Sequence, residues 1–402
     1  MNRTAWPAYI WIAVCNCGVG GSKSTETGGS VAQVVQPAVA VDTAKTVVEL
    51  AIRGGSDPMS RLVSVRYVAV GVNGEIVVLD RGAANVKVFD SAGRLSRIVG
   101  NSADERTALG EFLSTALVDH VGRIVVTQLV NRKAVVFGSD GQFAAAVRLP
   151  GDQSLPLGFA LSATGVLRQA VAPVTVIGRR RTLGTAIVIR EWRGEAPRAV
   201  CRIELGDPPS DGGLTYMATP VWDWMGIGDM VVSNGRDFDV RLYDERCHLQ
   251  RVLRLQRALT PLTSSDGRIL VDAATAKMTA QTKRAFMAIF YRFGGMARSY
   301  PAVVGLIAAS DGTIWLQAPV TADDVGRGVA FNFGHTGGSE WDVISRDGVL
   351  VRHVSLPMGF TLTRVQNGRL YGFAVDRAGT PTVQRLRLSN GESQARTHAN
   401  DG

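Results

Sequence analysis

The sequence predicts an all-β fold: a six-bladed β-propeller closed by an amino-terminal strand, with one helical insertion between the fourth and fifth blades. Three observations support this prediction: a recurring unit of short strands and glycine turns, a last repeat without its outer strand, and one unpaired strand-like run near the start. A period of about forty residues with four short strands is typical of propellers. One closed ring therefore accounts for most of the 402 residues.

The recurring unit is clearest in its first two copies. Gly74 and Gly93 stand in short turns that flank apolar runs such as Ile76–Leu79. Glycine adopts the positive φ that tight hairpin turns require, so the runs on either side of each turn are expected to pair. Gly122 and Gly141 repeat the two turns at the same spacing. The inner runs are apolar at every position, as expected for strands covered on both faces by neighbouring blades.

Four looser repeats follow, at 157–205, 221–255, 303–356 and 360–388. The last repeat ends at Leu388 without an outer strand, whereas the strand-like run Thr46–Arg53 has no partner in its own part of the chain. We therefore expect Thr46–Arg53 to complete the last blade and close the ring. Closure removes the open sheet edges that would otherwise invite aggregation.

One segment interrupts the β pattern. Thr275–Phe293 places Met278, Phe286 and Phe290 at helical spacing and is followed by two glycines. We expect a helix whose apolar stripe packs on the ring. The alternative is a helix that binds a partner or a membrane surface.

The units Gly74–Asp80 and Val86–Asp90, followed later by Gly110–Phe112, show the pattern Gly-x-Ile-x-Val-x-Asp, Val-x-Val-Phe-Asp and Gly-Glu-Phe. This pattern resembles the NHL repeat of six-bladed propellers over residues 61–151. The remaining repeats match it only in the length of their period. The wider superfamily contains protein- and RNA-binding modules, TolB-like periplasmic proteins, and lactonase or lyase enzymes. The resemblance therefore implies the fold and leaves the activity open.

The amino terminus has the features of an export signal. Arg3 precedes the apolar run Ala5–Val14, which is too short to span a bilayer and fits a signal peptide. The run Ile12–Cys15 resembles a bacterial lipobox, although Val14 replaces the usual small residue, and it predicts lipidation at Cys15. The alternatives are a secreted protein without lipid and a cytosolic protein with a poorly ordered amino terminus.

The predicted organisation is a signal peptide of lipoprotein type, a flexible tether, the propeller with its helical insertion, and a polar tail: residues 1–17, 18–45, 46–388 (insertion 257–301) and 389–402. We expect an exported protein of the cell envelope, either tethered to the membrane or free in the periplasm or outside the cell. In an oxidising compartment Cys201 and Cys247 could form a disulfide; the alternative is two buried thiols.

Charge and composition argue against several partner classes. The net charge is +9, and the arginines are spread along the chain with one run of three at Arg179–Arg181. A nucleic-acid binder usually concentrates its charge in a stripe or patch, so nucleic acid is not an expected partner. A membrane is expected as a partner only through the lipid anchor.

Catalytic motifs are also missing from the sequence. The five histidines show no HExxH spacing, and no Gly-x-Ser-x-Gly segment marks a nucleophile. The expected innermost strands offer only Asp119, His120 and Asp223 as metal ligands, and we expect these aspartates to cap turns or pair with arginines such as Arg66 or Arg364. We therefore predict no catalytic residue, no metal site and no cofactor.

Loop lengths single out one face of the expected ring. Loops between second and third strands share a face with the connections between blades, and the long segments all belong to that face: 101–114, 173–183, 257–301 and 319–338. Long loops on a rigid scaffold are where binding residues concentrate. We predict a binding or scaffold protein whose site for an anionic ligand or an unidentified partner protein includes Arg179, Arg180, Arg181, Asp323, Asp324, Arg327 and His335. The alternatives are a propeller hydrolase or lyase acting on a small molecule, and an unused surface that tolerates insertions.

Overall fold

The computed structural model describes residues 32–389, except 56, 101–106, 110–112, 129–131, 150–154, 163, 173, 178–179, 184–185, 193–196, 207–217, 226–228, 293–294, 332–335 and 377. The predicted signal peptide with Cys15, much of the predicted tether and nearly all of the polar tail lie outside the described residues.

Four antiparallel sheets follow one another along the chain. The first contains β3 (Val65–Val70), β4 (Ile76–Asp80), β5 (Asn85–Phe89) and β6 (Leu95–Val99). The second contains β7 (Leu113–Val118), β8 (Ile124–Gln128), β9 (Lys133–Phe137) and β10 (Phe143–Arg148). The third contains β11 (Leu155–Leu161), β12 (Leu167–Ala172), β15 (Ala186–Trp192) and β16 (Pro197–Glu204). The fourth contains β17 (Val221–Trp224), β18 (Met230–Ser233), β19 (Asp239–Tyr243) and β20 (Leu249–Arg254), with β1 (Ala32–Val34) added in parallel to β20.

An eight-stranded fifth sheet completes the fold, in the order β21-β22-β23-β24-β2-β27-β26-β25. Its bounds are β21 (Gly305–Ala308), β22 (Ile314–Pro319), β23 (Gly337–Ile344), β24 (Val349–Ser355), β25 (Phe360–Gln366), β26 (Arg369–Val375), β27 (Pro381–Ser389) and β2 (Gln36–Ile52). The strand β2 joins two four-stranded groups, because its first part pairs in parallel with β24 and its second part pairs antiparallel with β27.

The predicted pairing of the amino-terminal strand with the last repeat is confirmed. Residues 45–52 of β2 pair with β27 over Lys45–Ser389 to Ile52–Val383. The strand is longer than predicted, since residues 32–34 and 36–45, which the sequence analysis assigned to the tether, lie in β1 and β2. The composition of this segment explains the difference: it is rich in valine, which favours strands, whereas the Gly-, Ser- and Thr-rich part of the tether ends before it.

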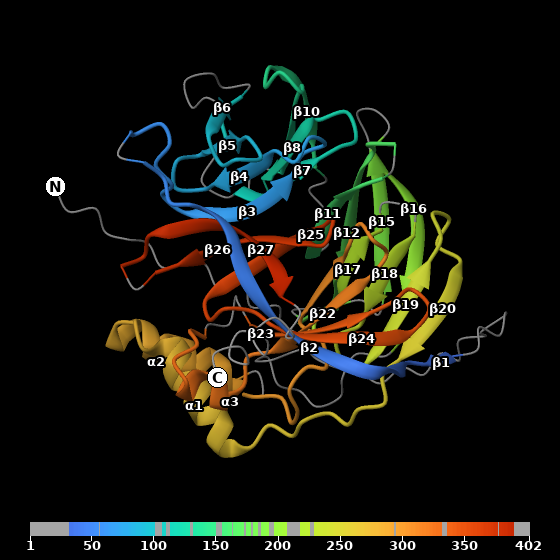
Figure 1. Cartoon of the computed structure of the whole chain (residues 1–402). Coiled ribbons are helices and arrows are strands. Elements are labelled where there is room, and N and C mark those ends of the chain that lie inside the picture. The colour runs from blue at the N-terminus through green and yellow to red at the C-terminus, as the bar shows by residue number, and fades with distance from the viewer. Residues whose placement is uncertain are drawn as a thin grey trace, which may run out of the picture.

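The sheets surround a common centre, as in a propeller (Figure 1). Their innermost strands form a cycle of contacts: β3 with β7, β7 with β11, β11 with β17, β17 with β21, β21 with β25, and β25 with β3. Hydrophobic clusters occupy the spaces between neighbouring sheets all round the cycle. At the closure, Val68 and Val78 of the first sheet pack with Tyr371 and Val383 of the fifth. Burial of such an aliphatic side chain contributes about 1.5–3 kcal/mol, so each interface helps to hold the ring together.

Two helices lie between β20 and β21 where one was predicted. They are α1 (Ser264–Thr275) and α2 (Ala280–Arg292), and α2 covers most of the predicted helix. The helix α1 was not predicted, because its first turn, Ser264–Gly267, consists of residues typical of turns. Thr263 and Asp266 nevertheless cap it with reciprocal hydrogen bonds. The predicted packing of the apolar stripe is corrected as well: Phe286 and Phe290 of α2 pack against Val271 of α1.

A disulfide joins the third and fourth sheets. Cys201 lies in β16 and Cys247 in the turn between β19 and β20, with their Cα atoms 5.8 Å apart. Of the two states that the sequence left open, a disulfide and two buried thiols, the structure therefore shows the disulfide. The bond links the outer strand of the third sheet to the turn that precedes the outer strand of the fourth.

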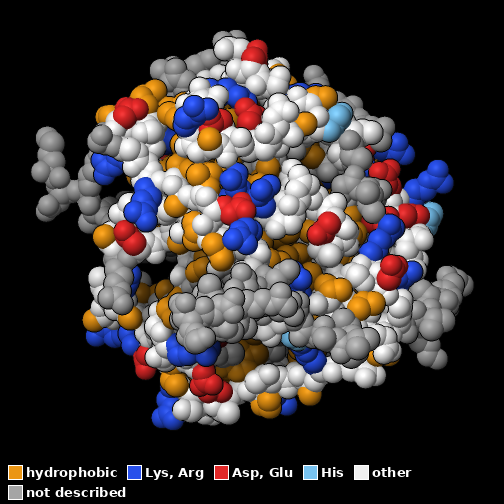
Figure 2. Space-filling view, viewed as in Figure 1, with side chains coloured by type: hydrophobic (Ala, Val, Ile, Leu, Met, Phe, Trp, Pro, Cys, Tyr) orange, Lys and Arg blue, Asp and Glu red, His pale blue; other side chains and the backbone are white. Residues whose placement is uncertain are grey.

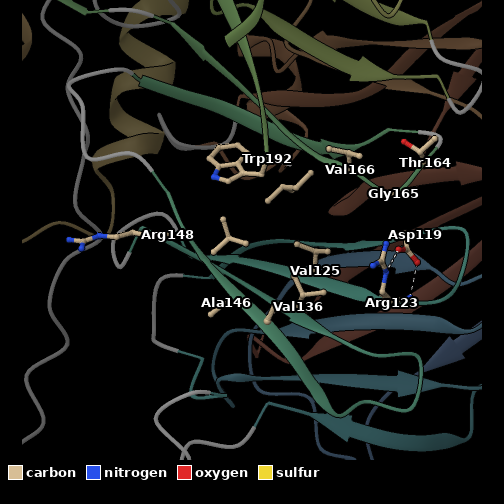
Figure 3. Close-up of a pocket in the computed structure, with 13 residues that line it drawn as sticks. Asp119, Arg123, Val125, Val136, Ala146, Arg148, Thr164, Gly165, Val166 and Trp192 are labelled. Carbon is tan, nitrogen blue, oxygen red and sulfur yellow. Dashed lines mark hydrogen bonds and ion pairs between the residues drawn. The ribbon is translucent and has the colours of Figure 1, made fainter. Parts of the chain in front are cut away.

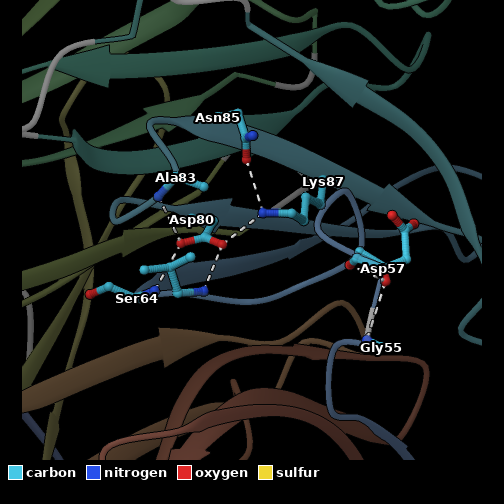
Figure 4. Close-up of polar contacts among 9 residues, drawn as sticks. Gly55, Asp57, Ser64, Asp80, Ala83, Asn85 and Lys87 are labelled. Atoms are coloured by element: carbon cyan, nitrogen blue, oxygen red, sulfur yellow. Dashed lines mark hydrogen bonds and ion pairs between the residues drawn. The ribbon is translucent and has the colours of Figure 1, made fainter.

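A buried ion pair stabilises the first sheet (Figure 4). The carboxylate of Asp80 accepts hydrogen bonds from the Lys87 ammonium at 2.7 Å and from the backbone N–H groups of Val63 at 3.0 Å and Ser64 at 2.9 Å. Asp80 is 0 % exposed and Lys87 is 1 % exposed. The pair therefore ties β4 and β5 to the segment that precedes β3.

Candidate functional site

The residues predicted for ligand binding fall into two separate segments. Arg180 and Arg181 lie in β14 (Arg180–Leu183), which pairs with β13 (Val174–Ile177) as a hairpin between β12 and β15. Asp323 and Asp324 lie in the short helix α3 (Ala322–Gly326), and Arg327 is its C-cap residue. Arg179 and His335 lie outside the described residues. The five described residues thus lie in connections between second and third strands, and their role in binding stays a prediction.

The contacts of Asp324 and Arg327 stabilise α3. The Asp324 carboxylate accepts hydrogen bonds from the backbone N–H of Thr321 at 2.7 Å and from its hydroxyl at 2.8 Å, and it pairs with Arg327. Burial alone would raise the pKa of Asp324, but the hydrogen bonds from Thr321 and Arg327 hold it below its usual value. In contrast, the structure records no hydrogen bond or ion pair from the Asp323 side chain to another described residue.

The three helices and their flanking segments form a unit with its own hydrophobic core, which we call the helical cap (described residues of 257–301 and 319–331). One cluster joins Leu270 of α1, Tyr300, Val320 and Phe331. The Tyr300 hydroxyl accepts a hydrogen bond from the backbone N–H of Ala322 at 3.1 Å and so attaches α3 to the segment that follows α2. Figure 1 shows the helices gathered on one side of the ring. The cap is therefore an ordered structure and not a set of loose insertions.

A second group of polar side chains lies at the centre of the ring. The innermost strands β3, β7, β11 and β25 each contain a β-bulge, and Tyr67, Thr115, Gly158 and Arg364 follow it at corresponding positions. A bulge re-aims the side chain next to it, often beside functional sites. Three of these positions carry polar side chains: Tyr67 and Arg364 interact electrostatically with Asp223 of β17, and Thr115 interacts with Tyr67. We call Tyr67, Thr115, Asp223 and Arg364 the central cluster.

Asp223 is the acidic member of the central cluster. Its carboxylate accepts hydrogen bonds from the backbone N–H groups of Ala308 and Trp224, both at 2.8 Å, and it interacts electrostatically with Arg364. Burial nevertheless raises the pKa of Asp223, against the lowering effects of Arg364 and of the two hydrogen bonds. The described contacts include no direct ion pair between Asp223 and Arg364, so the expected pairing with an arginine is reduced to this longer-range electrostatic interaction.

Tyr67 joins three sheets at the centre. Its hydroxyl donates to the backbone carbonyl of Thr363 at 3.4 Å and is in hydrogen-bonding contact with Thr115. Burial and the negative charge of Asp223 raise the pKa of Tyr67, so the phenol stays protonated at neutral pH. The cluster therefore combines a phenol, a hydroxyl, a guanidinium and a carboxyl group whose proton affinity is increased.

Asp119, another residue that the sequence offered as a possible metal ligand, caps a turn. The turn follows β7, and Asp119 there accepts hydrogen bonds from the backbone N–H groups of Val121 and Arg123 and pairs with the Arg123 side chain at 2.6 Å. This agrees with its expected role as a turn cap. Within the described ranges, no group of three or more His, Cys, Asp or Glu side chains could hold a metal ion.

Of the central cluster, Asp223 and Arg364 were named from the sequence, whereas Tyr67 and Thr115 were not. Neither side chain is unusual in a strand, and it is the bulge that directs them to the centre. A signal was present: the two residues are separated by the same number of positions as Gly74 and Gly122, and so occupy equivalent places in the first two repeats.

Comparisons with known proteins show the fold and nothing more specific. No known family model matches the chain, and no curated protein matches it. Among solved structures, a DUF4221 family member from Bacteroides vulgatus is 9 % identical with a TM-score of 0.52, covering 87 % of this chain and 99 % of its own. A protein of Bacteroides fragilis whose name describes it as exported is 8 % identical with a TM-score of 0.50, covering 89 % of this chain and 100 % of its own.

A lyase is also among the similar structures. Virginiamycin B lyase from Staphylococcus aureus is 9 % identical with a TM-score of 0.43, covering 86 % of this chain and 100 % of its own. The structural neighbours are β-propeller proteins, so the propeller arrangement is shown. Membership of the NHL family is not shown by these matches. Fold does not determine activity, so the function of this chain depends on its own sites.

Proposed function

We propose that this protein is a six-bladed propeller of NHL type that acts as a binding or scaffold protein of the cell envelope. In this interpretation the eight-stranded sheet counts as two blades divided at β2, and the four other sheets complete the ring. The helical cap on the long-loop face, together with the β13–β14 hairpin, presents the site for the partner.

The observation that carries this proposal is the separate hydrophobic core of the helical cap. An insertion without a function has no need of two capped helices and an internal cluster around Leu270 and Tyr300. Outside that cluster the cap offers an exposed aromatic side chain, Tyr291, which is 70 % exposed. Exposed aromatic groups and arginines are enriched at interfaces. The run of three arginines in the sequence, Arg179, Arg180 and Arg181, favours an anionic ligand or an acidic partner surface.

The proposal can be tested by site-specific photo-crosslinking in cells that export the protein. A photoreactive phenylalanine analogue at Tyr291 is expected to give a discrete covalent product with the partner. The same analogue at Asn73, in the turn between β3 and β4 on the opposite face, is the matched control and is expected to give none. Replacing Arg179, Arg180 and Arg181 with serine should weaken the Tyr291 product by roughly tenfold without lowering the melting temperature. Equal labelling from Asn73, or no product from Tyr291, contradicts the proposal.

We also propose export and lipidation at Cys15. The Cys201–Cys247 disulfide supports export, since such bonds persist in oxidising compartments. None of the described helices is long and apolar enough to cross a membrane. The variant Cys15→Ser should move the protein from the membrane fraction to the soluble fraction. The mass of the intact variant should show that the Cys201–Cys247 disulfide is still formed. A native protein that begins at Met1 would refute this localisation. A native protein in which Cys201 and Cys247 are both reduced would also refute it.

The second candidate function is a propeller hydrolase or lyase that acts on a small molecule at the central cluster. One observation favours it: Asp223 lies beside Tyr67 and Arg364 at the centre of the ring, and burial raises the pKa of its carboxyl, which favours the protonated form that a general acid donates from. Elemental analysis of the purified protein discriminates between the two functions. Stoichiometric calcium or zinc would favour the enzyme over the binding protein if removal of the metal abolished turnover of a small-molecule substrate. The variant Asp223→Asn should then lose the same turnover.

A further inference from the structure

The outer strands of the sheets fall into two groups. In the fourth and fifth sheets, β20 and β24 each pair in parallel with a part of the amino-terminal segment, either β1 or the first part of β2. In the first three sheets, β6, β10 and β16 end the sheet, with no described strand beyond them. These three edges are therefore the places where the ring can accept a further strand.

The edge of β10 differs from the other two because most of it carries no charge. An exposed edge strand invites pairing with another chain, and charged side chains usually prevent it. The strand β6 contains Arg97, and β16 contains Arg198, Arg202 and Glu204. In β10, residues 143–147 are Phe-Ala-Ala-Ala-Val, and the three alanines are exposed. Figure 2 shows basic and acidic side chains intermixed on the face that it displays, so charge of one sign does not select a partner there.

The position of β10 in its sheet matches the positions of β20 and β24 in theirs. The turn before each strand has the same backbone hydrogen bond, between residues 138 and 142, 244 and 248, and 345 and 349. Counted from these turns, Val147 of β10 corresponds to Leu253 of β20 and to Val354 of β24. Leu253 pairs with Gln33 of β1, and Val354 pairs with Ala44 of β2. The part of β10 that corresponds to both occupied edges is therefore the part around Val147.

Backbone groups of β10 point outward in this part of the strand. The N–H of Leu149 donates to the carbonyl of Arg132 at 2.6 Å, toward the inside of the sheet. Backbone groups alternate in direction along a strand, so those of Ala146 and Arg148 point away from β9. In β20, Arg254 corresponds to Arg148, and its carbonyl accepts a hydrogen bond from the amino-terminal segment at 2.8 Å. The edge of β10 thus presents the same groups with which β20 holds that segment.

A cavity of about 840 Å³ lies beside this edge, between the second and third sheets (Figure 3). Residues 145–148 of β10 line one side of it, and Val125, Val136 and Leu167 are among its apolar walls. Successive side chains of a strand point to opposite faces, so a lining of four successive residues means that the cavity reaches the backbone of β10. A strand bound at this edge would therefore border the cavity.

The amino-terminal segment places small side chains between neighbouring groups of strands. Val35 is 7 % exposed and packs in the cluster between the fourth sheet and strands β21–β24. Ala44 is 5 % exposed and packs in the cluster that joins those strands to β25–β27. A valine or alanine opposite Val147 would enter the cavity beside β10 in the same manner, because residues paired across two strands share a face.

We propose that the edge of β10 binds an extended segment of a partner protein as a fifth, parallel strand of the second sheet. The backbone groups of Ala146 and Arg148 hold the segment, and one of its small aliphatic side chains enters the cavity opposite Val147. The segment runs parallel to β10 because β1 and β2 both pair in parallel with the equivalent edges. This site is independent of the partner site on the helical cap, so either can fail without the other.

Fluorescence anisotropy of a labelled peptide with the sequence of residues 38–45, Ala-Val-Ala-Val-Asp-Thr-Ala-Lys, tests the proposal on the full chain. This sequence contains the three residues that pair with residues 352–354 of β24, so it suits an outer strand of this fold. One peptide should bind per chain, with saturation. The same peptide with every backbone amide N-methylated cannot donate to β10 and should bind at least about tenfold more weakly. No saturable binding, or equal binding of the two peptides, overturns the proposal.

A matched pair of variants locates the peptide on β10. Ala146→Pro removes an outward N–H and leaves the hydrogen bonds to β9 in place, so it should weaken the peptide about tenfold without lowering the melting temperature. Ala146→Val keeps the N–H and should leave the affinity unchanged. Equal affinity in the two variants contradicts the proposal.

A third variant tests the cavity. Ala145→Trp places an indole ring in the space that a side chain of the peptide is proposed to enter, and it should also weaken the peptide about tenfold. Unchanged affinity in this variant would show that no side chain enters the cavity and would overturn that part of the proposal.

The competing occupant of the edge is a second copy of the chain. Sedimentation velocity of the full chain at micromolar concentrations should show a monomer. A dimer that Ala146→Pro converts to a monomer would show that β10 pairs with a second copy, and it would overturn the proposal of a partner segment.

Discussion

Deletion of residues 36–52 is expected to abolish cooperative thermal unfolding. This segment is β2, which pairs with β24 and with β27, so its loss leaves two sheet edges unpaired in the middle of the fifth sheet. It also removes Ile52, which is 7 % exposed in the cluster between the fifth and first sheets. Circular dichroism during heating measures the effect. Deletion of residues 390–402, in the predicted polar tail, is the control and should leave the melting curve unchanged.

A matched pair of point variants tests the same closure without a deletion. Ile52→Ala should lower the free energy of unfolding by about 2–5 kcal/mol, because it opens a cavity in the interface that closes the ring. Val48→Ala on the same strand should change it by less than about 0.5 kcal/mol, because Val48 is 49 % exposed. A small loss for Ile52→Ala, equal to that of Val48→Ala, would show that this interface does not stabilise the ring.

The buried pair of Asp80 and Lys87 gives the second large expected effect. Either Asp80→Asn or Lys87→Met should destabilise the protein by about 3–5 kcal/mol, because each leaves one buried charge without its partner. The double variant should lose much less than the sum, and urea unfolding of all four proteins measures the coupling. Arg94→Ala, which breaks the exposed ion pair with Asp90, is the control and should have little effect. Additive losses in the double variant would contradict the coupling.

The same pair predicts how stability depends on pH. Burial alone would raise the pKa of Asp80, but the hydrogen bonds from Lys87, Ser64 and Val63 hold it below its usual value of about 3.9. A lowered pKa in the folded state means that the stabilisation is complete above about pH 4 and is lost as the pH falls through the folded-state pKa. The double variant should therefore be less sensitive to acid than the natural protein.

The ring was largely predictable from the sequence because its signals are local. Gly74, Gly93, Gly122 and Gly141 mark turns at a fixed spacing, and the structure places positive φ angles at all four. The lone strand at Thr46–Arg53 had one available partner, and it pairs there. The start of β2 and the helix α1 were missed, since valine-rich and Ser-Asp-Gly segments also suit tethers and turns.

The candidate sites were less predictable because they depend on distant contacts. Tyr67, Thr115 and Asp223 come from three different sheets, and only the closed ring and its bulges bring them together. The partner for Arg327 within α3 was equally invisible, because a charged loop residue gives no sign of whether it will bind a ligand or cap its own helix.

Native-state hydrogen exchange of the β2 amides is the most direct test of ring closure, on which the positions of both the helical cap and the central cluster depend. If β2 closes the ring, the amides of residues 45–52 exchange only through global unfolding, with the same free energy as those of β26 and β27. Exchange of residues 45–52 at a clearly lower free energy, while β26 and β27 remain protected, would show that the strand is a detachable edge and that the ring is stable without it.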